Sequence, residues 1–207
     1  MKKYLSFLGA IIAAVMFSAP AFAVSPYYIS SDIGAASFSK IKIYDTVTGV
    51  EHGNMSTTSG IDVVGALGRR FGNVRLEAEV GYQRNNADKY TSAHGVFDIP
   101  GNFSVTSYMV NSYYDFKRSG LTPYLSAGIG LADVTLNKVP DPPSIISETH
   151  SAFGYQLGAG LAIPVCKHMT LDTRYRYFGA NRVTLSGSHG KIDLSGSNFL
   201  AGLRISL

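Results

Sequence analysis

Apolar and polar residues alternate along most of the chain beyond residue 26. In segment 74–83 one set of alternate positions is apolar, and the other set carries Arg75, Glu77 and Glu79. Segment 169–178 repeats the pattern. A period of two places successive side chains on opposite faces of a strand, whereas a helix would scatter them around its surface. The pattern predicts an all-β chain whose strands have one apolar and one charged face.

The alternation and the turn residues between the alternating segments predict eight antiparallel strands. We expect them at 27–40, 60–71, 74–83, 103–116, 123–137, 151–165, 169–178 and 193–207. Tight turns follow at 72–73, 117–121 and 166–168, and stretches rich in Ser, Thr, Asn, Gly and Pro lie at 41–58, 84–102, 138–150 and 179–191. Short turns at one end and long loops at the other are typical of a transmembrane up-and-down β-barrel in the bacterial outer membrane. An even number of strands then places both termini in the periplasm and the long loops outside the cell.

A soluble barrel with an apolar interior is the alternative, and the composition of the polar face argues against it. This face combines glycines with long charged side chains, which suits a narrow, crowded lumen better than a water-exposed surface. We therefore expect the apolar face to contact lipid and the charges to pair across the lumen, because unpaired buried charges are costly. The expected lumen charge network is structural and consists of Asp32, Asp62, Arg75, Glu77, Glu79, Asp172, Arg174, Arg176 and Arg204. Lining of an ion pathway is the functional alternative.

Aromatic residues near the strand ends are expected to form two interfacial girdles: Tyr27, Tyr28, Phe71, Tyr82, Tyr114, Phe116, Phe153, Tyr175 and Tyr177.

The N-terminal segment predicts export. Lys2 and Lys3 precede an apolar run that is too short to span a bilayer, and Ala21 and Ala23 form an A-x-A cleavage site. We expect residues 1–23 to be a signal peptide and residues 24–207 to be one outer-membrane β-barrel domain. Cys166 is the one cysteine, so no disulfide within the chain is possible. Without Lys2 and Lys3 the formal net charge falls from +4 to +2 (16 basic and 14 acidic residues), which gives no reason to expect nucleic acid as a partner.

Several stretches resemble a family of small eight-stranded surface barrels. The sequence is similar to opacity-type outer-membrane proteins, which are grouped with outer-membrane protein X and the barrel of outer-membrane protein A. The resemblance rests on YISSDIG at 28–34, NSYYDF at 111–116, TPYLSAGIG at 122–130, GYQLGAG at 154–160 and LDTRYRY at 171–177. It implies the barrel fold and contact with a host receptor or glycan through the loops. One departure is the C-terminal Leu207, where the family usually has an aromatic residue.

Catalytic and metal-binding patterns are weak in this sequence. The pairs His150–Ser151 and Ser188–His189 are sequence neighbours, but adjacent strand residues point to opposite faces. The five histidines have no metal-ligand spacing. We expect no enzymatic activity, no metal site and no cofactor.

The loops are where we expect function to lie. Candidate contact residues are Tyr90, His94, Phe97, Arg182 and Lys191. The first hypothesis is a monomeric adhesin or surface antigen that contacts host cells, with outer-membrane lipid as its other partner. A small porin and a purely structural envelope protein are the alternatives.

Overall fold

The computed structural model is a single antiparallel sheet that closes on itself. It describes residues 26–207 except 40, 46–50, 93–94, 99–100, 117–119, 142–143 and 185–189. Its strands are β1 (Tyr27–Phe38), β2 (Ile41–Asp45), β3 (Glu51–Thr57), β4 (Gly60–Phe71), β5 (Val74–Ser92), β6 (Gly95–Asp98), β7 (Asn102–Asp115), β8 (Thr122–Asp141), β9 (Ser144–Pro164), β10 (Met169–Thr184) and β11 (Gly190–Ser206). Among the described residues, no helix is long and apolar enough to cross a membrane.

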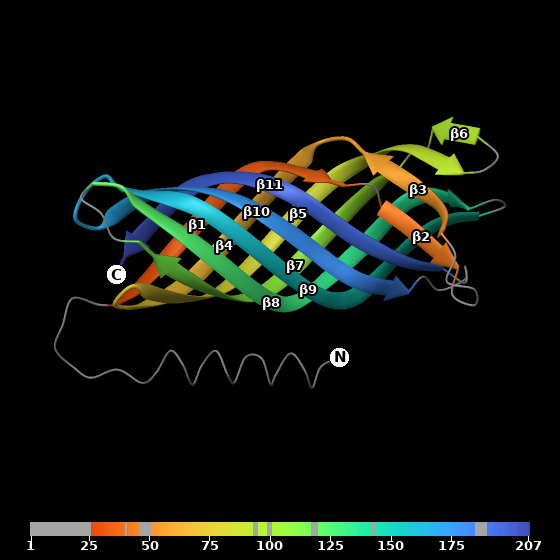
Figure 1. Cartoon of the computed structure of the whole chain (residues 1–207). Helices are drawn as coiled ribbons and strands as arrows, with labels where there is room; N and C mark the ends of the chain where they lie inside the picture. The colour runs from red at the N-terminus through yellow and green to blue at the C-terminus, as the bar shows by residue number, and fades with distance from the viewer. Residues whose placement is uncertain are drawn as a thin grey trace.

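Eight of these strands form the barrel wall. They pair in the order β1–β4–β5–β7–β8–β9–β10–β11, and β11 returns to β1 from Tyr28↔Ser206 to Phe38↔Gly196. The closed, tilted wall is visible in Figure 1. Closure pairs every wall strand on both sides, as a sheet in hydrocarbon requires. Leu207 donates its N–H to the carbonyl of Tyr27, which continues the pairing of β11 with β1 by one residue.

The two ends of the barrel differ in construction. The turns Gly72–Asn73 and Cys166–His168 lie at one end, together with the C-terminus; we call this the short-turn end. The opposite, long-hairpin end holds β2, β3 and β6 (Figure 1). There β2 pairs with β11 and β3 pairs with β5, so this hairpin continues the wall above β1 and β4.

The predicted loop lengths were wrong. The stretches expected to be loops at 41–58 and 84–102 contain β2, β3, β6 and the last part of β5. Those expected at 138–150 and 179–191 are mostly the ends of β8 and β9 and of β10 and β11. The polar residues of these stretches still form paired strands. The outer face of the barrel meets water here, so the strands need no apolar residues on that face.

Candidate functional site: a filled lumen and projecting hairpins

All nine charged residues of the expected network point into the lumen, and each has an ion-pair partner there. Glu79 is the central group. Its carboxylate lies 3.0 Å from Nη1 of Arg174 and 3.1 Å from Nη1 of Arg176. It also accepts hydrogen bonds of 3.0 Å from the side-chain amides of Asn111 and Gln156. Glu79 therefore joins β5, β7, β9 and β10 through four hydrogen bonds.

The two arginines of β10 carry the network to the opposite wall. Nη2 of Arg174 lies 3.2 Å from the Asp32 carboxylate on β1, and Nη2 of Arg176 pairs with Asp62 on β4. Nη1 of Arg174 also donates to the Tyr113 hydroxyl at 2.6 Å. Each of these arginines is thus held between two carboxylates.

A second group of charges lies nearer the short-turn end. Nε of Arg75 donates to both carboxylate oxygens of Asp115 at 3.0 Å, and its Nη1 lies 3.0 Å from Glu77. The Arg75 guanidinium also packs 4.3 Å from the centre of the Tyr113 ring. In the same region, Arg204 and Asp172 pair at 3.4 Å.

Tyr28 corrects the expected girdle. Its side chain is buried in the lumen, where the hydroxyl donates to Glu77 at 2.6 Å. Tyr27 and Tyr28 are consecutive strand residues, so only one of them can face outward. Phe71, Tyr114 and Phe116 face outward toward the short-turn end, and Tyr82, Phe153 and Tyr175 face outward toward the other end.

Above the charges, the lumen is filled by apolar side chains that the sequence reasoning missed. The cluster consists of Phe38, Phe103, Val105, Met109, Ala132, Val134, Ala152, Phe178, Ala180 and Leu194. We call it the apolar plug. Amide side chains lie beside the plug, where Gln83 donates to Asn85 at 2.9 Å and Asn198 donates to Gln83 at 3.0 Å.

At the height of the apolar plug, the outward-facing residues of the wall change from apolar to polar. On β8 and β9 the outward apolar residues reach Leu131 and Phe153. The next outward pairs are polar: Ser151 donates to Asp133 at 2.5 Å, and the hydroxyls of Thr135 and Thr149 lie 2.9 Å apart. An apolar interior under a polar exterior is the arrangement of a barrel in water. The outward apolar residues form a lipid-facing band, which therefore ends between Leu131 and Asp133 on β8.

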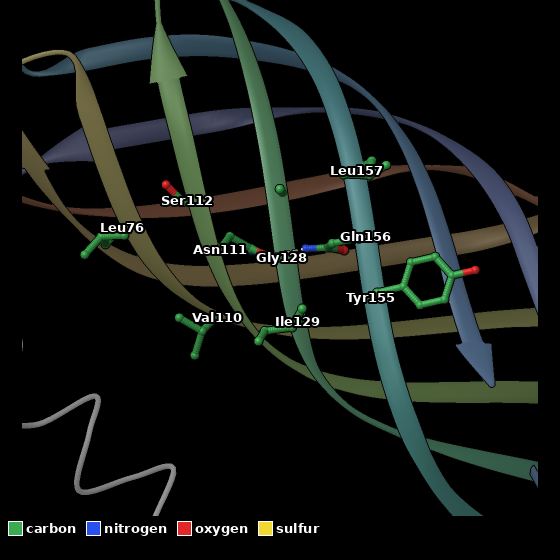
Figure 2. Close-up of a pocket in the computed structure, with 10 residues that line it drawn as sticks. Leu76, Val110, Asn111, Ser112, Gly128, Ile129, Tyr155, Gln156 and Leu157 are labelled. Atoms are coloured by element: carbon green, nitrogen blue, oxygen red, sulfur yellow. Dashed lines mark hydrogen bonds between the residues drawn. The ribbon is translucent and has the colours of Figure 1, made fainter. Parts of the chain in front are cut away.

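The outer wall has a shallow hollow within this band, shown in Figure 2. It measures about 390 Å³ and centres on the small cross-strand neighbours Ser112 and Ala127. Its lining is apolar and includes Val110, Ile129 and Leu157. It carries no constellation of catalytic side chains.

Beside the hollow, Asn111 and Gln156 lie on the lumen side of the wall at Gly128 (Figure 2). Nε2 of Gln156 donates to Oδ1 of Asn111 at 2.6 Å across that glycine. A Cβ atom at Gly128 would lie 1.8 Å from the same oxygen, so only glycine allows the two amides to meet.

The candidate loop contacts lie largely outside what the structure describes. His94 is outside the described residues, as are Ser188 and His189. The backbones of Tyr90, Phe97, Arg182 and Lys191 lie in β5, β6, β10 and β11, and nothing is described of their side chains. His168 is exposed in a turn, and the hydroxyl of Ser151 donates to the Asp133 carboxylate. Within the described ranges, no group of three His, Cys, Asp or Glu side chains is placed to hold a metal.

The closed wall, the lipid-facing band and the charged lumen define a bacterial outer-membrane β-barrel. Comparison with known protein families leads to the same class of protein. The outer membrane protein beta-barrel domain family matches residues 9–205, and this chain belongs to that family.

A curated relative matches part of the chain. Outer membrane protein PagN of Salmonella typhimurium (strain LT2) is 39% identical over 98 residues, which cover 44% of this chain and 41% of the relative. The match thus spans less than half of that protein.

Solved structures share the fold. Neisserial surface protein A matches with a TM-score of 0.58 and 21% identity, over 88% of this chain and 98% of that one. OprG of Pseudomonas aeruginosa matches with a TM-score of 0.56 and 12% identity, over 87% and 95% of the two chains. The outer membrane protease OmpT of Escherichia coli matches with a TM-score of 0.52 and 12% identity, over 90% and 99%. At these identities the similarity establishes the fold alone.

Proposed function

We propose that this outer-membrane protein is a non-conducting surface scaffold that binds host cells through the hairpins of its long-hairpin end. In this proposal residues 1–23 are removed as a signal peptide, the short-turn end faces the periplasm and the hairpins face outside. The chain acts as a monomer, and its partner is a host receptor or glycan. The observation that carries the proposal is the length of wall beyond the lipid-facing band.

The β8–β9 hairpin gives the scale of this projection. From Asp133, the first outward polar residue, β8 runs on to Asp141. Eight steps at about 3.3 Å per residue make roughly 26 Å of strand, or about 20 Å of height at the usual barrel tilt. A protein whose role ended at the membrane would not need paired strands that far from it.

The filled lumen supports a surface role over the porin alternative. An eight-stranded interior is just wide enough for side chains to fill it, and here ion pairs and the apolar plug occupy successive levels. Planar-bilayer recording with the folded protein should give no stable conductance steps. Stable single-channel steps would instead support a porin.

The adhesion proposal is tested with purified, folded protein and cultured host cells. We expect saturable binding by the full chain, and loss of most binding when the β5–β6 and β10–β11 hairpins are both shortened. A variant with only the β8–β9 hairpin shortened is the control, because it also removes projecting wall but spares the candidate contacts. A heat-dependent shift in gel mobility checks that each variant is folded. Equal binding by all three proteins would refute the proposal.

A further inference from the structure

We infer that a single water molecule is a structural component of the lumen, bound between Asp172 and Arg75. The site is a small cavity between β1, β5 and β10, on the short-turn side of Glu79. Its lining includes Ser30, Asp32, Arg75, Asp172 and Arg174. The inference concerns the barrel itself and is independent of any binding partner.

Two buried polar atoms at this cavity need a partner. Oδ1 of Asp172 and Nη2 of Arg75 make no hydrogen bond within the part of the chain that the structure describes. Asp172 is 7% exposed and Arg75 is 2% exposed, so neither atom can turn to bulk water. Their remaining polar atoms are engaged: Asp172 Oδ2 pairs with Arg204, and Arg75 binds Asp115 and Glu77 through Nε and Nη1. A buried donor and a buried acceptor without partners are unfavourable unless something bridges them.

The size of the cavity limits what the bridge can be. About 10 Å³ is open to the centre of a water-sized sphere. That is close to the minimum for one water molecule and too small for a larger ligand.

The chemistry of the two atoms selects water among small species. Oδ1 of Asp172 needs a donor, and Nη2 of Arg75 needs an acceptor. Water supplies both at once. A metal cation could not accept from the guanidinium, and a halide could not donate to the carboxylate. Arg174 also lines the cavity, and its buried Nε, a donor without a described partner, is a candidate for the third hydrogen bond that a buried water usually makes.

The water would connect groups that otherwise stand apart. It links the Arg204–Asp172 pair of β10 and β11 to the Arg75 cluster of β5 and β7. Through Arg174 it also reaches Glu79. These three groups of charges then form one hydrogen-bonded network.

A crystal structure of the folded protein, at a resolution that shows ordered water, tests the inference. We expect one isolated density peak at about 2.7–3.2 Å from both Asp172 Oδ1 and Arg75 Nη2, the distance range of ordinary hydrogen bonds. A direct Arg75–Asp172 hydrogen bond, an empty site, or a peak at the shorter distances of a metal ligand would each overturn it.

A pair of matched variants adds a functional readout. Ser30→Val places a larger apolar group at the cavity, and Ser31→Val makes the same change on the exposed outer face of the same strand. We expect Ser30→Val to lose the density peak and to unfold at lower urea concentration than Ser31→Val. Equal urea midpoints for the two variants would contradict a structural role for the water. If Ser30→Val does not fold, the wild-type density alone decides.

Discussion

Replacing Glu79 by glutamine should weaken the barrel more than any exposed change of the same kind. Glu79 is 2% exposed and accepts hydrogen bonds from two guanidinium groups and two amides. Glutamine has nearly the same shape but no charge, and its own NH₂ group would face donors. Arg174 and Arg176 would each keep one carboxylate, Asp32 and Asp62 respectively.

The size of the effect follows from breaking a buried ion pair on one side. Removing one partner typically costs about 3–5 kcal/mol, because the remaining charge stays buried without full compensation. The retained carboxylates protect against a larger loss. We therefore expect Glu79→Gln to reduce the free energy of unfolding by about 3–5 kcal/mol.

The assay is urea unfolding of the protein in lipid vesicles, followed by tyrosine fluorescence and by the heat-dependent gel shift. Asp88→Asn is the matched control, since Asp88 is exposed on the same strand and its loss should change the free energy by no more than about 0.5 kcal/mol. If Glu79→Gln and Asp88→Asn unfold at the same urea concentration, Glu79 does not hold the network together.

Three further substitutions test other parts of the structure. Gly128→Ala should cost about 1–3 kcal/mol, because its Cβ must displace the Asn111 amide, whereas Gly65→Ala on the open outer face should cost nothing in the same urea assay. Ala127→Arg, within the lipid-facing band, should reduce the free energy of unfolding in vesicles by about 2–4 kcal/mol, and Thr135→Arg above the band should reduce it by at most about 1 kcal/mol. Equal reductions would show that the band does not end between these two residues. Phe178→Ala in the apolar plug should cost about 3–5 kcal/mol, and clearly more than Phe153→Ala on the outer face, where the side chain is 54% exposed. Urea midpoints that rank Phe153→Ala as the more damaging change would contradict the plug.

Much of the wall was predictable because alternation is a local signal. Segment 74–83 shows the outer and inner faces of β5 directly, and Asp172, Arg174 and Arg176 do the same for β10. The eight-stranded closed fold was therefore predicted, and the structure and the family membership confirm it. The partners of each charge were not predictable, because Glu79 and Arg174 meet across the lumen at a sequence distance that no local pattern reports.

The apolar plug escaped prediction for a physical reason. The rule that apolar side chains face outward holds only where the outside is lipid. Phe103 and Val105 obey the same period of two as Asn111 on β7, but they lie at a height where the outer neighbours are polar. Alternation identifies the face of a strand and not its depth, so the sequence could not show where the rule reverses. The loops were predicted wrongly because residues that are typical of turns lie in paired strands of the long hairpins.

The central claim is that the lipid-facing band ends between Leu131 and Asp133, and site-directed spin labelling along β8 tests it most directly. Cys166 would be replaced by serine, and single cysteines with nitroxide labels would be placed at the outward positions Leu125, Ala127, Ile129, Leu131, Asp133 and Thr135 in vesicles. The account predicts that collisions with oxygen dominate from Leu125 to Leu131, and that collisions with a water-soluble nickel complex dominate at Asp133 and Thr135. Dominance of the nickel complex at Ala127 and Ile129, or no change of regime along the strand, would contradict it.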